Sequence, residues 1–570
     1  MNIIENQLPE QLTKNDLVGV DLEIFQMGSR KLHRPTGTFA SMQVAVNDND
    51  VYLITDERKV APTLKRIQKA RWAFHNAHFD LFHLRRWADV PVRDDVLDTM
   101  IVERIAFANY YENFGLKDLA RRWFDVRMEK DTRKEFETAN YLTDDMKHYG
   151  CYDAHMTRKI AQKQMQELDT WVFSAWYNIE LPALWALLDL RGFTLHVSKW
   201  RALAREQEII VADLQDALGF NPGSPPQTKK ALLDAGLQVN STGEPVLKSA
   251  LLKVGIDADN EWEEGEFDYI LDDYPWAGIV LDVLKYREAA KRANAYGENF
   301  ITNFVESDGK VHASFNVLAA RTGRSSSADP NLQQVPRVKA YRQCFIASKG
   351  CRIIKADYSG QELRILAQIS QDDAMLEAFR HNDDVHLNTA RYIFNDNTIQ
   401  KDDPRRQAAK SLGFGMVYGI GASALAAQLK ISKEEAQQYI NGYFNLYKGV
   451  RTWMQKQERL DTVSTLTGRK VYLNKYARGS RNQSFNFPIQ SSASEMLKLA
   501  LGNIYYKWPS EFESFGVIAP VHDELVIEAK TVQAKKVSRF VVSEMEAAMK
   551  SMLPDVPAVV DAVIGKTWGG

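Results

Sequence analysis

The chain has 570 residues, of which 45% are hydrophobic and 26% are charged, a composition typical of a globular protein with three or four domains. Its net charge of −2 lacks the basic surplus of many nucleic-acid-binding proteins, although a basic cleft can be balanced by an acidic exterior. Three cysteines without a C-x-x-C pair argue against a disulfide framework or a zinc site, and no apolar run is long enough to cross a membrane.

The chain begins with a segment, residues 1–16, that lacks a basic stretch followed by an apolar core, so we expect no signal peptide and reduced, cytoplasmic thiols. Residues 15–23, NDLVGVDLE, alternate apolar and polar side chains as a strand does and end in Asp21 and Glu23. Because residues two apart share one face of a strand, both carboxylates point the same way. D-x-E alone is common on exposed strands and assigns no function.

Two further acidic positions accompany predicted helices. Asp80 precedes the helical run LFHLRRW, and Asn76 lies four residues before Asp80. Tyr149 and Asp153 belong to a helical pattern at residues 144–168, where a spacing of four places them on one face.

The middle of the chain indicates helices interrupted by turn residues. Residues 199–219 are amphipathic and predict a helix. FNPGSPPQ, residues 220–227, ends that helix with three prolines and a glycine.

The run CRIIK, residues 351–355, is typical of a strand, and Asp357 and Tyr358 come where that strand ends. Glu362 belongs to a run, ELRIL, that indicates the start of a helix. A carboxylate at the end of a buried strand is poorly solvated unless a positive group meets it, so a divalent cation is a natural partner. The alternative is an aspartate that caps the following helix.

In residues 402–420, DDPRRQAAKSLGFGMVYGI, four side chains recur every four positions: Arg406, Lys410, Phe414 and Tyr418. On a helix they form one stripe of two cations followed by two aromatic rings. The stripe suits a nucleoside triphosphate, because the cations would meet phosphates and the rings would pack on sugar and base. The alternative is a solvated cationic end followed by an aromatic end in the core.

Residues 516–530, GVIAPVHDELVIEAK, contain two β-rich runs around His522, Asp523 and Glu524, which predicts a hairpin with acids at its tip. An acid there and Asp357 on an adjacent strand could hold two Mg²⁺ ions about 3.5–4 Å apart, the arrangement used for in-line phosphoryl transfer. A solvated acidic turn is the alternative.

These segments resemble, in order, the signatures of the family A DNA polymerases. D-Y-S-x-x-E-L-R occurs at 357–364, R-x-x-x-K-x-x-x-F-G-x-x-Y-G at 406–419 and V-H-D-E at 521–524. T-G-R-x-S-S-x-x-P-N-L-Q-x-x-P occurs at 322–336. The resemblance covers almost the whole chain. It implies an α/β multidomain fold in which an RNase H-like 3′–5′ exonuclease domain precedes a right-hand polymerase with an α+β palm, fingers and a thumb.

The resemblance also implies where each region lies. We expect a 3′–5′ proofreading exonuclease domain at 1–170, a linker and thumb at 171–309, the first part of the palm at 310–371, the fingers at 372–447, and the second part of the palm with the C-terminal motif at 448–570. Because the exonuclease motifs begin close to residue 1, we expect no 5′ nuclease domain. That arrangement suits a replicative enzyme of a phage or plasmid, or a trimmed repair enzyme.

The N-terminal motifs D-x-E, N-x-x-x-D and Y-x-x-x-D resemble those of DnaQ-like 3′–5′ exonucleases. Tyr149 would orient the attacking water, and Leu22 stands where proofreading relatives commonly have threonine, so contact with the terminal nucleotide is expected to differ. The carboxylates that would hold two metal ions are Asp21, Glu23, Asp80 and Asp153.

The polymerase resemblance implies that Asp357 and Asp523, helped by the carbonyl of Tyr358, hold two Mg²⁺ ions. Arg406 and Lys410 would neutralise charge on the β and γ phosphates.

The same resemblance implies a selective nucleotide pocket. Phe414 and Tyr418 would shape the space for sugar and base, and Glu362 would exclude a 2′-hydroxyl. Phe414, where some relatives have tyrosine, predicts poor use of dideoxynucleotides. Gly360 and Gln361 depart from the usual signature, which leaves nucleotide affinity and fidelity open.

Four residues are implied to contact DNA. Arg324 would test the shape of the base pair in the minor groove. Asn486 and Gln490 would face the template side, with a helix cap or a buried polar link as the alternative, and His522 would touch the primer end. Asn482 stands where the family usually has an arginine, so no arginine contact is expected there.

The sequence therefore predicts a template-directed DNA polymerase that adds dNTPs to a primer 3′ end by two-metal phosphoryl transfer and proofreads with a 3′–5′ exonuclease, in replication or repair. The expected cofactor is Mg²⁺, two ions per site, with Mn²⁺ as a substitute. The expected partners are primer-template DNA, dNTPs and replisome proteins such as a helicase-primase or a single-strand binding protein. We expect a monomer in the cytoplasm of a bacterium or a phage-infected host, without membrane contact. The alternatives are a 3′–5′ exonuclease whose polymerase half only binds DNA, and a DNA-binding scaffold in which both sites are silent.

Overall fold

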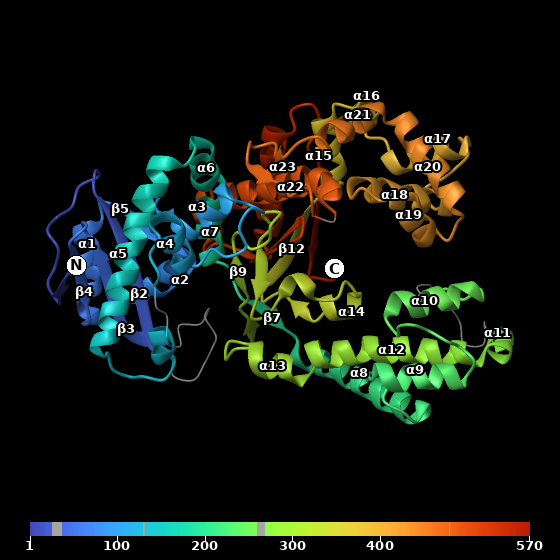
Figure 1. The fold of residues 1–570 in the computed structure, drawn as a ribbon, viewed down its shortest axis with the longest axis horizontal. Coiled ribbons are helices and arrows are strands. Elements are labelled where there is room, and N and C mark those ends of the chain that lie inside the picture. The colour runs from blue at the N-terminus through green and yellow to red at the C-terminus, as the bar shows by residue number, and fades with distance from the viewer. Residues whose placement is uncertain (26–36, 129–130, 259–267, 478) are drawn as a thin grey trace. The chain divides into compact units, whose positions relative to one another are not determined.

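The computed structural model describes residues 1–25, 37–128, 131–258, 268–477 and 479–570. The chain forms two compact units, whose helices and strands are labelled in Figure 1. The first comprises Met1–Arg191, Ala313–Gln334 and Lys349–Gly565, and the second comprises Gly192–His312, Val335–Ser348 and Lys566–Gly570. Across the described ranges, no helix is both long and apolar enough to cross a membrane.

The N-terminal part of the first unit is built on a six-stranded sheet with strand order β1-β4-β3-β2-β5-β6. Its central strand β2 (Leu17–Phe25) pairs antiparallel with β3 (Thr38–Ala45) and parallel with β5 (Arg71–Phe74). The strand predicted at 15–23 is therefore confirmed, displaced by two residues. The remaining strands are β1 (Asn2–Glu5), β4 (Asp50–Ile54) and β6 (Leu97–Asp98).

The long helix α5 (Asp144–Glu167) packs on β2 and β3, and confirms the helix predicted at 144–168. Gly19 permits this close approach, because a Cβ atom there would lie 2.2 Å from the carbonyl oxygen of Ala154. The other helices of this part are α1 (Val60–Ile67), α2 (Ala77–Leu84), α3 (Thr99–Ala106), α4 (Leu116–Phe124), α6 (Thr170–Ala175) and α7 (Leu181–Leu188).

One boundary in this region differs from the prediction. The sequence pattern placed Asp80 before a helix, but α2 begins at Ala77, so Asp80 lies in its first turn. The cause is Asp98, whose carboxylate accepts the backbone N–H groups of Asn76 at 3.1 Å and Ala77 at 2.7 Å. These bonds satisfy N–H groups at the start of α2 that have no partner within the helix, so the helix starts earlier than its apolar pattern indicates.

The C-terminal part of the first unit centres on an antiparallel sheet with strand order β15-β16-β12-β17. Its central strand β12 (Cys351–Tyr358) runs further than the predicted 351–355 and includes Asp357. Helix α23 (Ala534–Met552) packs on β12 and on α22 (Ser480–Tyr506). The other strands are β9 (Ser314–Asn316), β10 (Ser326–Ala328), β13 (Thr462–Ser464), β14 (Lys470–Tyr472), β15 (Val517–Val521), β16 (Glu524–Lys530) and β17 (Val560–Gly565).

A group of helices lies between β12 and β13 in the chain. Within it α17 packs on α18, and α18 together with its C-cap residue Tyr418 carries the stripe of cations and aromatic rings. The helices are α15 (Gln361–Ser370), α16 (Asp373–Arg380), α17 (Val385–Phe394), α18 (Pro404–Val417), α19 (Ala422–Leu429), α20 (Lys433–Leu446) and α21 (Lys448–Gln457).

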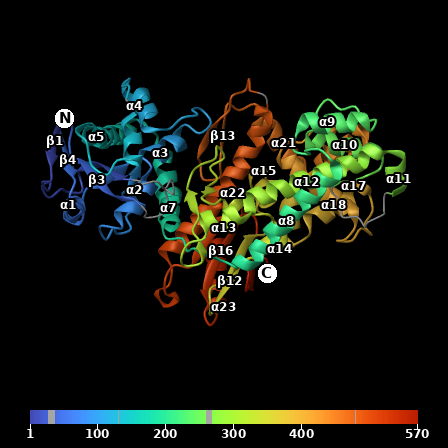
Figure 2. The same cartoon turned by 90° about the horizontal axis from the view of Figure 1, so that it is seen from below.

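The second unit contains two long helices, α8 (Val197–Leu218) and α12 (Pro275–Tyr296), which lie side by side (Figures 1 and 2). The helix predicted at 199–219 corresponds to α8. The core of this unit includes the buried side chains of Leu232, Leu247 and Trp276. The other elements are β7 (Phe193–Leu195), α9 (Pro225–Asp234), α10 (Glu244–Lys253), α11 (Asp268–Asp273), α13 (Glu298–Phe304), β8 (Lys310–Val311), α14 (Lys339–Arg342) and β11 (Phe345–Ile346).

Candidate active sites

The first candidate site begins with a link between β2 and α2. The Asp80 carboxylate accepts the backbone N–H of Leu22, between Asp21 and Glu23, at 2.9 Å. This bond uses only the backbone of Leu22, and the Leu22 side chain is buried. Leucine in place of threonine therefore leaves the link between the acidic residues intact.

Electrostatics show how closely the acidic groups of this site approach one another. The pKa of Asp80 is raised well above its ordinary value, first by burial and then by the negative charge of Asp21 and other carboxylates. The pKa of Tyr149 is also raised, first by burial and then by nearby carboxylates, of which Asp153 acts most strongly. The predicted residues that the structure brings together here are Asp21, Glu23, Asp80, Tyr149 and Asp153.

These residues line a cavity of about 610 Å³. Ser314, Phe315 and Asn316 of β9 also line it, although they come from a distant part of the sequence. Sequence reasoning missed these three residues, and no local pattern marks them, because only the tertiary packing of β9 brings them to the cavity.

Whether the site suits a cation can be judged from its donor atoms. Within the described residues, no group of three or more Asp, Glu, His or Cys side chains stands ready to hold a metal ion. The donors are nevertheless carboxylate oxygens, which Mg²⁺ prefers, and a bound cation would relieve the repulsion that, after burial, raises the pKa of Asp80. The chemistry of the donor set therefore fits a divalent cation.

The second candidate site lies on β12 and on the turn between β15 and β16. The backbone N–H of Tyr358 contacts the carbonyl oxygen of Asp523 at 3.4 Å, so Asp357 and Asp523 lie on adjacent segments. Asp357 is directly opposite Glu524 on one side and Asp561 on the other, and directly opposed residues share a face of the sheet. Sequence reasoning did not identify Asp561.

Two other residues of this signature stabilise the fold. Tyr358 is buried and its hydroxyl donates to the carbonyl of Met545 at 3.0 Å, so the hydroxyl is not available to a substrate. Arg364 is also buried, and its guanidinium donates to the carbonyls of Ser359 and Pro557, both at 2.7 Å.

Glu362, in the first turn of α15, joins three distant segments. Its carboxylate accepts from Arg324 at 3.0 Å and from the hydroxyl of Tyr418 at 3.2 Å. Gln490 of α22 also hydrogen-bonds Tyr418. Burial raises the pKa of Glu362, and the contacts with Arg324 and Tyr418 oppose that rise.

The stripe on α18 divides into two parts. Lys410, Phe414 and Tyr418 line a cavity of about 540 Å³, together with Asn482 of α22. Arg406 does not line this cavity. Its guanidinium instead donates to the carboxylate of Asp384, from Nε at 2.9 Å and from Nη2 at 2.6 Å.

His386 was missed by sequence reasoning. Its ring lies 5.6 Å from that of Phe414, and burial lowers its pKa to about 4, with a smaller opposing effect from the Asp384 carboxylate. The sequence D-x-H at a helix start, Asp384 to His386, was the available signal, since the aspartate caps the helix that carries the histidine.

Two further residues that are predicted to contact DNA, Asn486 and His522, lie on α22 and on the β15–β16 hairpin. Asn486 is on α22, four residues before Gln490, and among the described residues its side-chain oxygen has no hydrogen-bond partner. His522 is exposed at the tip of the β15–β16 hairpin with a left-handed φ of 58°.

The segment before Arg324 is fixed by buried polar contacts. The carbonyl of Gly323 accepts from Lys498 at 2.6 Å and from Ser494 at 2.9 Å. Lys498 also pairs with Glu180 at 2.7 Å, and both side chains are almost fully buried. The backbone immediately before Arg324 is therefore tied to α22.

Comparison with known proteins gave matches to two family models. The model described as DNA polymerase family A matches residues 200–570, and the model described as 3′-5′ exonuclease matches residues 3–169.

Named relatives agree with these matches. The chain is 28% identical to DNA polymerase I of Chloroflexus aurantiacus over 98% of this chain and 60% of the relative, and 29% identical to that of Pseudomonas aeruginosa over 90% and 58%. It is 31% identical to the thermostable DNA polymerase I of Thermus aquaticus over 68% of this chain and 47% of the relative. The chain thus spans between about half and 60% of the length of these relatives.

A solved structure resembles the whole chain. It is the POL domain of Pol1 from M. smegmatis in complex with DNA primer-template and dNTP, with a TM-score of 0.83, 24% identity, and coverage of 100% of this chain and 99% of that one. This likeness shows the fold, and confirms the predicted class of an α/β multidomain chain with an exonuclease domain followed by a right-hand polymerase.

Proposed function

The chain belongs to DNA polymerase family A, and on that premise we propose that it is a template-directed DNA polymerase with 3′–5′ proofreading exonuclease activity. One observation carries the proposal: a chain that matches both family models holds two separate acidic sites. One lies around Asp80 on β2, α2 and α5, and the other lies around Asp357 and Asp523 on the C-terminal sheet.

In the polymerase site, Asp357, Asp523 and the carbonyl of Tyr358 would hold two Mg²⁺ ions. Ions bound there would lower the pKa of the primer 3′-hydroxyl and neutralise charge on the departing pyrophosphate. The adjacent backbones of Tyr358 and Asp523 support this assignment, because they place both donors at one edge of the sheet. Glu524 and Asp561 would add negative charge to that edge.

The nucleotide would bind along α18. Lys410 would meet the phosphates with a point charge, and Arg406 would meet them through its guanidinium. Phe414 and Tyr418 line the cavity that Lys410 also lines, and would pack on sugar and base. Glu362, held by Arg324 and Tyr418, would occupy the space that a 2′-hydroxyl requires.

The DNA contacts are proposed from polar groups around this pocket. Arg324 and Gln490 both lie near Tyr418, and would reach the minor-groove acceptors that all base pairs share. Asn486, one helical turn before Gln490 on α22, would present its side-chain amide to the template side. His522 at the exposed hairpin tip would contact the primer end.

In the exonuclease site, Asp21, Glu23, Asp80 and Asp153 would hold two metal ions. Tyr149 would orient the attacking water: its raised pKa keeps the hydroxyl protonated and able to donate a hydrogen bond.

We assign the regions accordingly. Residues 1–170 would be the exonuclease domain, 171–309 the linker and thumb, 310–371 and 448–570 the palm, and 372–447 the fingers. The substrates would be primer-template DNA and dNTPs. A monomer, replisome partners and a cytoplasmic location are further parts of this proposal.

Primer extension tests the proposal directly. With a labelled primer on a longer template and Mg²⁺, we expect extension when dNTPs are present and shortening of the primer when they are absent, and EDTA should abolish both. Shortening without any extension would instead favour a 3′–5′ exonuclease whose polymerase half only binds DNA.

A further inference from the structure

Arg406 on α18 is held by a fixed carboxylate. Asp384 Oδ2 accepts from both Nε and Nη2 of the guanidinium, at 2.9 and 2.6 Å. The two side chains are only 17% and 23% exposed, for Asp384 and Arg406 respectively. Burial raises the pKa of the Asp384 carboxyl, but the bonds from Arg406 and from a backbone N–H more than offset it, so that the pKa is lowered and the pair is ionised.

The position of this carboxylate is set by a helix. Asp384 is the N-cap of α17, and its other oxygen, Oδ1, accepts the backbone N–H of Leu387 at 3.0 Å. The same cap begins the helix that presents His386 to the ring of Phe414. One side chain therefore fixes both the start of α17 and the guanidinium on the neighbouring helix.

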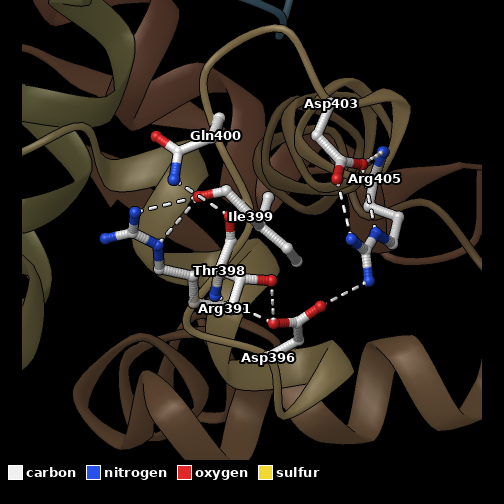
Figure 3. Close-up of polar contacts among 7 residues, drawn as sticks. All are labelled: Arg391, Asp396, Thr398, Ile399, Gln400, Asp403 and Arg405. Atoms are coloured by element: carbon white, nitrogen blue, oxygen red, sulfur yellow. Dashed lines mark hydrogen bonds and ion pairs between the residues drawn. The ribbon is translucent and has the colours of Figure 1, made fainter.

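The adjacent arginine, Arg405, has different partners from Arg406 (Figure 3). Arg405 pairs with Asp403, the N-cap of its own helix, at 2.7 Å and with Asp396 at 2.9 Å, and it is 40% exposed. Its side chain is engaged within the α17–α18 connection, where Arg391 also donates to the carbonyl of Ile399. Arg406, in contrast, falls on the helical stripe with Lys410.

We propose that Asp384 is a positioning residue for nucleotide binding, which acts by holding the Nε and Nη2 edge of Arg406 so that Nη1 is presented to the phosphates of the incoming nucleoside triphosphate. A long arginine side chain loses conformational freedom when it binds a ligand, and a fixed counter-ion reduces that loss because the side chain is already ordered. This inference rests on the proposed polymerase function and assigns a residue that the signature motifs do not contain.

The contact between Asp384 and Arg406 could instead oppose nucleotide binding, and the direction in which nucleotide affinity changes distinguishes the two effects. If Asp384 merely competed with phosphate for the guanidinium, removing its charge would tighten nucleotide binding. If it positions Arg406, removing its charge weakens nucleotide binding and leaves the chemical step unchanged.

The test is Asp384→Asn, since asparagine also caps helices well but lacks the charge and replaces the Oδ2 acceptor of Arg406 with an amide group that donates. In single-nucleotide incorporation on a primed template, we expect the KM for dNTP to rise about tenfold, the size of one charge-assisted contact, with kcat changed less than about twofold. Inorganic tripolyphosphate should inhibit the variant more weakly by a similar factor. The matched control is Asp403→Asn, which alters a helix-capping aspartate paired with the adjacent arginine and should leave both constants unchanged.

A double-variant cycle isolates the mechanism. In an Arg406→Gln background, Asp384→Asn should raise the KM no further, because the group that it positions is gone. An unchanged or lower KM, a fall in kcat alone, or a full additional increase in the Arg406→Gln background would overturn the inference. Asp384→Ser, which also caps a helix, serves if the asparagine variant has lost its fold as judged by circular dichroism. Failure of the wild type to extend any primer would instead refute the proposed function itself.

Discussion

The protonation state of His386 decides whether the ring beside Phe414 is neutral or positively charged. Its pKa is lowered to about 4 because the ring is buried, so the ring is neutral in the folded protein at pH 7. Between the ordinary value of 6.5 and about 4, the unfolded chain takes up a proton that the native protein does not, so stability falls as the pH falls through this window.

NMR titration of the His386 ring should therefore show a midpoint near pH 4. Replacing His386 with Gln should reduce the loss of stability between pH 6.5 and about 4, measured by denaturant unfolding at each pH. A midpoint near 6.5 would mean that the ring is solvated and that it can carry charge toward a phosphate at neutral pH.

Glu362 is the residue on which sugar selectivity should depend. Arg324 and Tyr418 fix its carboxylate from two sides, so it forms a rigid obstacle. We expect Glu362→Ala to raise the incorporation of ribonucleotides relative to deoxyribonucleotides by at least about tenfold, measured as a ratio of kcat/KM values. Glu362→Gln keeps the size of the side chain and should retain most of the selectivity; equal selectivity in all three proteins would rule out this role.

At the scale of elements, the contact between α5 and β2 sets the exonuclease geometry. A Cβ atom at Gly19 would lie 2.2 Å from the carbonyl oxygen of Ala154 and 2.8 Å from Arg158, so a side chain would push α5, which carries Asp153, away from the strand that carries Asp21. We expect Gly19→Ala to lower exonuclease activity about a hundredfold, while extension is retained.

The control for this change is Gly278→Ala in α12, where the nearest atom to an added Cβ is 4.0 Å away. Degradation of a labelled single strand measures the effect. Wild-type degradation by Gly19→Ala would show that α5 adjusts without cost and that the close packing does not determine the activity.

The elements that sequence reasoning predicted correctly were those with a local pattern. Alternation predicted β2, the spacing of apolar residues predicted α5 and α8, and two β-rich runs around an acidic turn predicted the β15–β16 hairpin. The start of α2 was wrong because the N–H groups that begin it are satisfied by Asp98, which is distant in sequence.

Contacts between distant segments set the limit of what the sequence could predict. The stripe on α18 was visible from its spacing, but nothing local indicates that Arg406 pairs with Asp384 while Lys410 lines the cavity. Likewise, β9 lines the exonuclease cavity only because of how it packs in the fold.

At the scale of the whole molecule, the first unit holds both candidate sites, and buried polar contacts within it join the segment before α7 to α22. Glu180, just before α7, pairs with Lys498 of α22, and Lys498 also holds the carbonyl of Gly323 beside Arg324. Removing one partner of such a buried pair typically lowers the free energy of unfolding by about 3–5 kcal/mol. Variants meant to separate the two activities should therefore leave Glu180 and Lys498 unchanged.

The most direct measurement uses one labelled primer-template with Mg²⁺, with and without dNTPs, and compares wild type with Asp523→Ala and Asp21→Ala. We predict that Asp523→Ala loses extension and keeps degradation, whereas Asp21→Ala loses degradation and keeps extension. Extension by Asp523→Ala at the wild-type rate would contradict the assignment of the C-terminal acidic site, and the protein would then have to be reconsidered as a nuclease.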